Sequence, residues 1–154
     1  MEFPIEKLIG AAAASREKAY APYSNFRVGA AILTKEGRYY TGCNIENASY
    51  GLTCCAERVA LFKAVSNSER SFEAIAVTAG TDEYCSPCGA CRQALAEFGT
   101  DIKVYMVNGS GNYQVRTVAE LLPESFALKT PAPGGDDDSD DQKTITELIE
   151  PVSR

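Results

Sequence analysis

The chain has 154 residues, of which 45% are hydrophobic, and its formal net charge is −6 at pH 7. This length and composition predict one globular domain with a buried core, and every apolar run is too short to span a membrane. The first residues contain no basic segment followed by an apolar stretch and a cleavage site, so the sequence predicts a cytoplasmic protein.

The negative charge is concentrated near the C-terminal end. Residues 129–154 carry three basic and seven acidic side chains, so residues 1–128 have a net charge of only −2. That body has no basic stripe, which argues against a nucleic-acid partner. Residues 131–143 have almost no apolar content and include five aspartates within six residues. We therefore expect residues 129–154 to form an acidic, disordered extension, with a capped short helix at 144–149.

Hydrophobic periodicity indicates helices and strands in a regular order. Apolar residues at helical spacing predict a first helix over about 4–20, ended by Ala21 and Pro22. Residues 28–34 are mostly apolar without polar alternation, which is typical of a strand covered on both faces. The later elements are expected to be a strand at 38–45, a helix at 55–65, a strand at 74–79, a helix at 88–98, strands at 102–107 and 113–116, and a short helix ending at 122.

The last of these helices has a local start signal, because Thr117 is followed three residues later by Glu120, the spacing of a capping box. A helix, a hairpin and then strands alternating with helices predict an α/β protein. The expected architecture is a three-layer α/β/α domain with a central mixed five-stranded sheet.

The most informative motif is Cys88-Gly-Ala-Cys91, which follows Pro87 at an expected helix start. Residues three apart on a helix share a face, and the positive end of the helix dipole favours thiolates. Two thiolates in this arrangement favour the binding of a zinc ion, of which they would be two ligands. A third ligand is available upstream at another expected helix start, where Cys54 and Cys55 adjoin.

Glu57 decides between several uses of these cysteines. It lies two residues after Cys55, a spacing that aims its carboxylate beside the thiolate, toward a water on the metal, and that favours Cys55 over Cys54 as the ligand. This pattern favours a catalytic zinc site with three thiolate ligands. A closed four-cysteine structural zinc site and a redox dithiol are the alternatives, since the chain has six cysteines. There is no histidine to serve as a ligand, acid or base.

Four segments together resemble a known family. Residues 55–57 (CAE) and 87–91 (PCGAC) are similar to the three-cysteine form of the zinc-deaminase signature. Residues 21–30 (APYSNFRVGA) and 42–50 (GCNIENASY) resemble the small homotetrameric cytidine deaminases. The resemblance runs from about residue 5 to about residue 126, so it implies that residues 1–128 form a cytidine deaminase-like catalytic domain.

The resemblance implies a zinc-dependent hydrolase of pyrimidine salvage. It would convert cytidine and deoxycytidine to uridine and deoxyuridine, releasing ammonia, with Zn²⁺ held by Cys55, Cys88 and Cys91. Glu57 would act as both base and acid, taking a proton from the attacking water and passing it to N3 of the ring. Arg58, beside Cys55, is expected to donate hydrogen bonds to the thiolates and offset their charge.

Substrate contacts are implied by the resemblance alone. In similar proteins the aromatic side chain at Phe26 packs against the base, while Asn44 and Glu46 bind the 3′-hydroxyl of the sugar. Contact at the 3′ rather than the 2′ position would admit both ribo- and deoxyribonucleosides.

The resemblance also implies that backbone groups near Ala56 and Ser86 read the edge of the pyrimidine. Tyr50 and Phe126 match positions that close the pocket across a subunit boundary, which implies a homotetramer. Two other readings remain open: a deaminase of a cytosine-bearing antibiotic such as blasticidin S, and a non-catalytic protein built around a four-cysteine zinc site.

Overall fold

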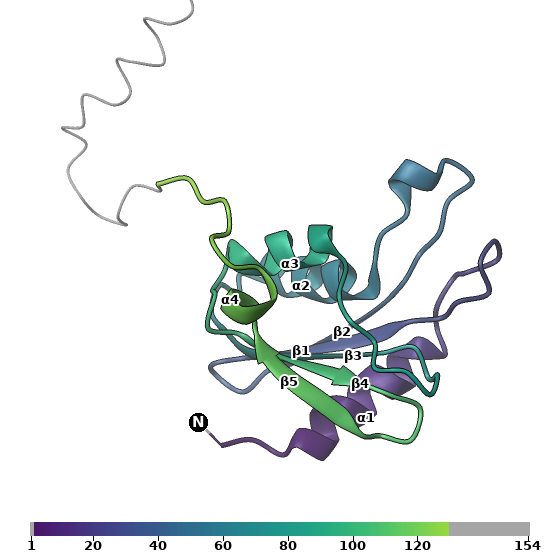
Figure 1. Ribbon diagram of the computed structural model, residues 1–154, viewed down its shortest axis with the longest axis horizontal. Coiled ribbons are helices and arrows are strands. Elements are labelled where there is room, and N and C mark those ends of the chain that lie inside the picture. The colour runs from purple at the N-terminus through teal and green to yellow at the C-terminus, as the bar shows by residue number, and fades with distance from the viewer. Residues whose placement is uncertain (1, 130–154) are drawn as a thin grey trace, which may run out of the picture.

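Five strands form one mixed sheet in the order β2-β1-β3-β4-β5 in this computed structural model, which describes residues 2–129 (Figure 1). Strands β3 and β4 are parallel, and every other neighbouring pair is antiparallel. The strands are β1 (Gly29–Thr34), β2 (Tyr39–Cys43), β3 (Phe72–Thr78), β4 (Lys103–Val107) and β5 (Tyr113–Thr117). The helices are α1 (Ile5–Arg16), α2 (Ala56–Ser66), α3 (Gly89–Ala96) and α4 (Val118–Leu121).

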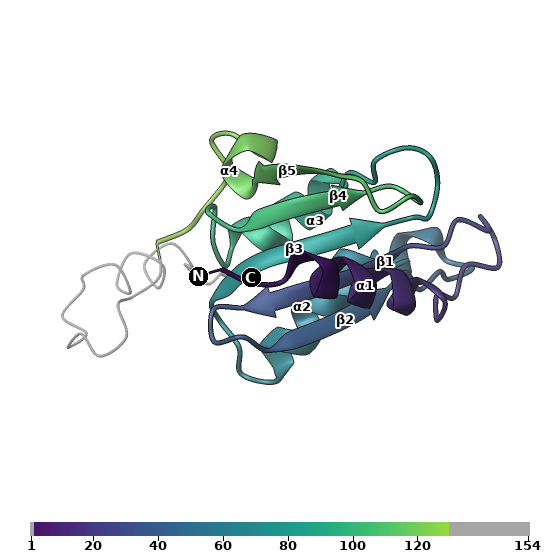
Figure 2. The same cartoon turned by 90° about the horizontal axis from the view of Figure 1, so that it is seen from below.

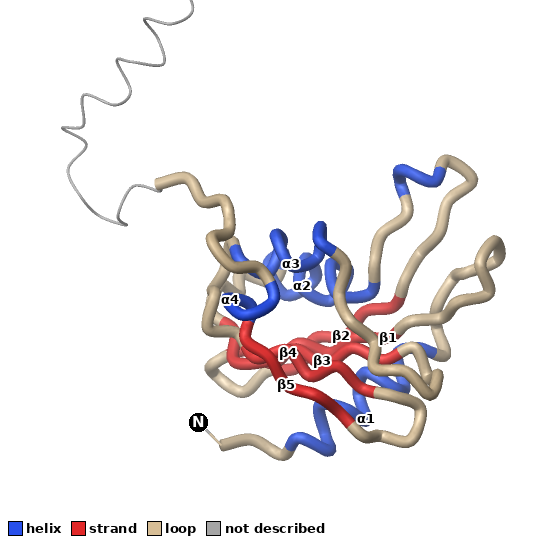
Figure 3. The backbone as a smooth tube through the Cα atoms, viewed as in Figure 1, coloured by secondary structure: helices blue, strands red, loops and turns tan. Residues whose placement is uncertain are grey.

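The helices cover both faces of the sheet. Helix α1 lies on one face, and α2 and α3 lie on the other, as the views along and across the sheet show (Figures 1 and 2). The backbone coloured by secondary structure shows the same three layers, with loops gathered at the ends of the strands (Figure 3). The predicted α/β/α architecture with a mixed five-stranded sheet is therefore confirmed.

Each face of the sheet buries its own apolar core. Ile32 of β1 packs on the side of α2 and α3, in one cluster with Leu61 and Leu95, whereas its neighbour Leu33 packs on the side of α1, in one cluster with Leu8. All six residues of β1 are buried, as expected for a strand covered on both sides. This double burial explains why the sequence of β1 shows no alternation of polar and apolar residues.

Helix α1 is shorter than predicted, because it ends at Arg16 rather than near residue 20. The Arg16 Nε atom donates hydrogen bonds to the carbonyl oxygens of Arg27 and Ala79, and Tyr20 forms a β-bridge with Ile45. Tertiary contacts of the chain after the helix thus end it before Pro22. The other predicted elements are found within two residues at each end, and the capping box of Thr117 and Glu120 is present.

The loop after β2 contains a short 3₁₀ turn over Tyr50–Leu52 that the sequence pattern did not predict. Among residues 2–129, no helix combines the length and the apolar character that crossing a membrane would require. The expected acidic extension at 129–154, except its first residue, and its helix at 144–149 lie outside the described residues.

Candidate metal centre and nucleoside pocket

Three thiols meet where the first turns of α2 and α3 approach each other. Cys55 is the N-cap residue of α2 and Cys88 the N-cap residue of α3, while Cys91 is the third residue of α3. Neither N-cap thiol accepts a capping hydrogen bond from its own helix, so both remain free for another partner. The three predicted ligands are therefore brought together, at the positive ends of two helix dipoles.

The spacing of the sulfurs matches a tetrahedral zinc ion. All three Sγ atoms lie within 4.8 Å of one another, with 3.8 Å between Cys55 and Cys88 and 3.5 Å between Cys88 and Cys91. Tetrahedral Zn–S bonds of about 2.3 Å place sulfur atoms about 3.8 Å apart, so the distances from Cys88 to the other two sulfurs are close to those of a zinc site. Thiolates are also among the ligands that zinc prefers in proteins.

No fourth protein ligand joins the cluster within residues 2–129, and all six cysteines of the chain lie in that range. Cys54, the neighbour of Cys55, and the other two cysteines, Cys43 and Cys85, are not part of the group. Burial raises the pKa of Cys85 to about 12 and also raises that of Cys54, so both are neutral thiols. Three thiolates leave one coordination position of a tetrahedral ion open, as a catalytic site requires.

The Glu57 side chain is buried beside this cluster. Only 5% of Glu57 is exposed, and it lines the same pocket as Cys55 and Cys88. Burial raises the pKa of the Glu57 carboxyl to about 7, with a further upward contribution from the Cys55 thiolate. A carboxyl group with such a pKa exchanges protons near neutral pH, which is the property of a general acid and base.

Arg58 contacts the cluster from one turn along α2. Its Nη2 atom donates to the Cys55 sulfur at 3.4 Å. The pKa of Cys55 is lowered to about 5, first by the hydrogen bond from the Cys91 thiol and also by Arg58, while the pKa of Cys91 is raised because it is the donor. The Arg58 Nε atom is buried and has no hydrogen-bond partner within the described part of the chain.

A pocket of about 210 Å³ opens beside Cys55 and Glu57. Four of the predicted substrate-binding residues line it: Phe26, Asn44, Ala56 and Ser86. Its wall also includes Val28, Thr53 and Cys85, which the motifs did not single out. Thr53 lies outside the segments that resemble the family, and Val28, although within residues 21–30, is an apolar residue with no chemistry to mark it.

Asn44 and Glu46 organise the loop that carries Phe26. The Asn44 side chain accepts from the backbone amide of Val28 at 2.9 Å and donates to the Phe26 carbonyl at 2.7 Å. The Glu46 carboxylate accepts from the amides of Tyr23 and Ser24 and from the Ser24 hydroxyl. These hydrogen bonds set the position of the Phe26 ring, which is 49% exposed at the mouth of the pocket.

Tyr50 and Phe126 lie away from this wall. Tyr50 is 77% exposed and lines a neighbouring hollow of about 390 Å³ together with Tyr23 and Glu46. Phe126 is 71% exposed, and its backbone carbonyl accepts a hydrogen bond from Gln93 on α3. Neither residue is part of the wall of the pocket that holds Glu57, Cys55 and Cys88 within one copy of the chain.

Comparison with known proteins identifies the family to which this geometry belongs. The model of the cytidine and deoxycytidylate deaminase zinc-binding region matches residues 4–107. A cytidine deaminase of Halalkalibacterium halodurans is 57% identical over 125 residues, covering 80% of this chain and 95% of that protein. A cytidine deaminase of Sporosarcina psychrophila is 54% identical over 124 residues, covering 80% and 91% respectively.

A crystal structure of the cytidine deaminase from Burkholderia pseudomallei superposes with a TM-score of 0.78 at 50% identity, covering 80% of this chain and 100% of that one. A blasticidin-S deaminase from Bacillus cereus is more distant, at 35% identity over 107 residues, which are 64% of this chain and 76% of that protein. Sequence, fold and the cluster of three thiols thus agree, and the chain belongs to the zinc-binding cytidine and deoxycytidylate deaminase family.

Proposed function

We propose that this chain catalyses the hydrolytic deamination of cytidine and deoxycytidine to uridine and deoxyuridine, with release of ammonia. The observation that carries this proposal is the placement of Glu57, buried in the same pocket as a cluster of three cysteines at zinc spacing. The relatives at 54% and 57% identity are cytidine deaminases, which supports cytidine as a substrate. The reaction would serve pyrimidine salvage in the cytoplasm.

Cys55, Cys88 and Cys91 would hold the metal. A zinc ion bound there supplies the Lewis acidity that makes water a nucleophile near neutral pH. The positive ends of α2 and α3 and the guanidinium of Arg58 offset the negative charge of the three thiolates, so that the ion keeps its electrophilic character.

Glu57 would carry the protons of the reaction. Its carboxylate takes a proton from the attacking water and delivers it to N3 of the cytosine ring as oxygen adds to C4. A second proton passes through the same carboxylate to the amino group, which leaves as ammonia. Burial of Glu57 in the pocket wall favours this role, because it excludes competing bulk water from the carboxylate.

The nucleoside would lie between the metal centre and the loop at 21–28. The Phe26 ring packs on the base, and the unused donor and acceptor capacity of Asn44 and Glu46 binds the 3′-hydroxyl. Backbone groups at Ala56 and Ser86 hydrogen-bond the edge of the pyrimidine. Contact at the 3′ rather than the 2′ position would admit both the ribo- and the deoxyribonucleoside.

A homotetramer would complete the pocket. Tyr50 and Phe126 are 77% and 71% exposed in one copy of the chain, and packing against neighbouring subunits would remove both rings from water. In that arrangement each ring would close the pocket of a neighbour. A wholly monomeric protein with full activity, measured by analytical ultracentrifugation and turnover at the same concentration, would contradict this assignment.

The proposed function is tested by measuring zinc content and nucleoside turnover on the same preparation. We expect one zinc per chain and a loss of cytosine absorbance with cytidine and deoxycytidine as substrates. Turnover of blasticidin S but not of cytidine would favour the antibiotic deaminase, in line with the more distant relative. Bound zinc without turnover of any cytosine compound would instead favour the non-catalytic zinc protein.

A further inference from the structure

Gly42 of β2 lies directly beneath the first turns of α2. A Cβ atom added to Gly42 would be 2.5 Å from the Ala56 carbonyl oxygen and 2.4 Å from the Ala60 amide nitrogen. Both are backbone atoms, which cannot move aside as a flexible side chain does. Gly42 is not among the glycines with a positive φ, so an alanine is allowed there by conformation and is excluded only by the helix above it.

The first turn of α2, which packs on Gly42, is also the turn that carries the proposed metal ligand and proton carrier. Ala56 directly follows Cys55 and precedes Glu57 and Arg58. The height of this turn above the sheet sets where the Cys55 sulfur lies relative to Cys88 and Cys91 on α3. A side chain of even one carbon at Gly42 would therefore move one metal ligand relative to the other two.

Strand β2 is also bound to the helix on the opposite face of the sheet. The buried hydroxyl of Ser15, on α1 at the opposite face of the sheet, donates a 2.7 Å hydrogen bond to the Gly42 carbonyl. The strand at Gly42 is thus held from both sides, by α1 below and by α2 above (Figure 1).

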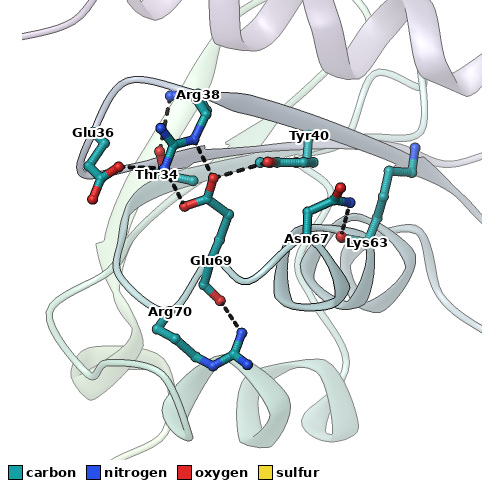
Figure 4. Close-up of polar contacts among 8 residues, drawn as sticks. All are labelled: Thr34, Glu36, Arg38, Tyr40, Lys63, Asn67, Glu69 and Arg70. Atoms are coloured by element: carbon teal, nitrogen blue, oxygen red, sulfur yellow. Dashed lines mark hydrogen bonds and ion pairs between the residues drawn. The ribbon is translucent and has the colours of Figure 1, made fainter.

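The far end of α2 is also tied to β2. Glu69, in the turn after α2, accepts hydrogen bonds from the Arg38 guanidinium and, at 3.0 Å, from the Tyr40 hydroxyl (Figure 4). Tyr40 lies two residues before Gly42, so the two occupy the same face of β2. Because this end of the helix is anchored, strain introduced at Gly42 falls on the first turn.

We propose that Gly42 is a positioning residue for the metal centre. Its missing side chain lets α2 lie on β2 at the height that brings Cys55 to zinc-binding distance from Cys88 and Cys91. This inference rests on the proposed zinc site and extends it to a residue that touches neither the metal nor the nucleoside.

Gly42→Ala tests the proposal, with Gly29→Ala as the matched control. A Cβ at Gly29 of β1 would be 2.1 Å from the Ala12 carbonyl oxygen and 2.5 Å from the Arg16 amide, so it meets the backbone of α1 on the opposite face. Zinc affinity of the metal-free proteins is measured by competition with a chromophoric chelator. The thiolate-to-metal bands of the Co²⁺-substituted proteins report the geometry of the site.

We expect Gly42→Ala to bind zinc about tenfold or more weakly, with altered Co²⁺ bands and a lower kcat at similar KM. Gly29→Ala is expected to lose thermal stability but to keep the zinc affinity and Co²⁺ bands of the parent. Parental zinc affinity and bands in Gly42→Ala, or equal weakening in both variants, would overturn the proposal. Leu8→Ala, which opens the buried core at α1, replaces the control if Gly29→Ala does not fold.

If Gly42→Ala does not fold, Ser15→Ala supplies the test, because it removes the hydrogen bond that ties the Gly42 carbonyl to α1 and so fixes the position of the strand between α1 and α2. Weaker zinc binding with shifted Co²⁺ bands would support the proposal, and parental values would overturn it. Turnover of cytidine by the parent tests the proposed function separately. Zinc affinity and Co²⁺ bands test Gly42 whichever nucleoside the enzyme uses.

Discussion

The Nη2 atom of Arg58 lies 3.4 Å from the sulfur of Cys55, one helical turn before it on α2. This contact places the positive charge of the guanidinium beside the Cys55 thiolate. It therefore offsets part of the negative charge of a three-thiolate metal centre. Together with the hydrogen bond from the Cys91 thiol, which has the larger effect, it lowers the pKa of Cys55 to about 5, well below that of an ordinary thiol. Cys55 is therefore ionised and ready to bind metal at neutral pH.

Replacing Arg58 should weaken the metal centre. Arg58→Gln removes the charge and the hydrogen bond, so we expect zinc affinity to fall by about 10–100-fold, as for other residues that support metal ligands. Arg58→Lys keeps the charge but not the planar arrangement of donors, so its zinc affinity should lie between those of the parent and Arg58→Gln. Competition with a chelator measures the zinc affinity of all three proteins. Arg116→Gln, an exposed arginine on β5, is the control, and an equal effect there would contradict the assignment.

Replacing Glu57 should separate metal binding from turnover. Glu57→Gln keeps the shape of the side chain but cannot take up or deliver the protons of the reaction. We expect kcat to fall by at least about 10²–10⁴-fold, the usual contribution of a general acid–base group, with the zinc content unchanged. The loss of cytosine absorbance and metal analysis on one preparation provide the measurement. Substantial activity in Glu57→Gln would exclude Glu57 as the proton carrier.

Phe26 should contribute mainly to nucleoside binding. Phe26→Ala removes the aromatic surface on which the base packs, an interaction worth about 1–3 kcal/mol for stacked bases, so KM should rise about tenfold or more. The control is Tyr113→Ala, because Tyr113 on β5 is 41% exposed, close to the 49% of Phe26, but does not line the pocket. Steady-state kinetics with cytidine test both variants, and an unchanged KM in Phe26→Ala would remove Phe26 from the site.

Glu69 should make the stability of the fold sensitive to acid. Hydrogen bonds from Arg38 and then from Tyr40 lower the pKa of the Glu69 carboxyl below the 4.5 of an ordinary glutamate (Figure 4). A carboxyl whose pKa is lower in the folded state stabilises the protein above the unfolded pKa and loses that effect as the pH falls through the folded pKa. Glu69→Gln should therefore lower the Tm at pH 7, and the difference from the parent should narrow below about pH 4.5.

Thermal unfolding followed by circular dichroism between pH 3 and pH 7 measures this effect. The exposed Glu2, near the N-terminus, supplies the control Glu2→Gln, which should follow the parent at every pH. A Tm difference for Glu69→Gln that stays constant down to pH 3 would show that the carboxylate charge is not what stabilises this turn.

Several features follow from short stretches of sequence alone. The capping box of Thr117 and Glu120 is formed as predicted, because both partners lie within one turn of the same helix. The apolar run of β1 correctly predicted a strand buried on both faces. Cys88 and Cys91 share one face of a helix start, because helical geometry brings residues three apart together. Such features depend on contacts between near neighbours in the chain.

Only the tertiary structure decided how these pieces meet. It ended α1 at Arg16, where contacts with residues 27 and 79 outweigh the helical periodicity that continues toward residue 20. It also buried Glu57 and brought Cys55 within 3.8 Å of Cys88, 33 residues away. The packing of α2 on Gly42 has no local signature, since a glycine in a strand looks the same whether a helix covers it or not. A sequence pattern reports which groups are available, whereas the packing of layers sets the distances between them, and a metal centre depends on those distances.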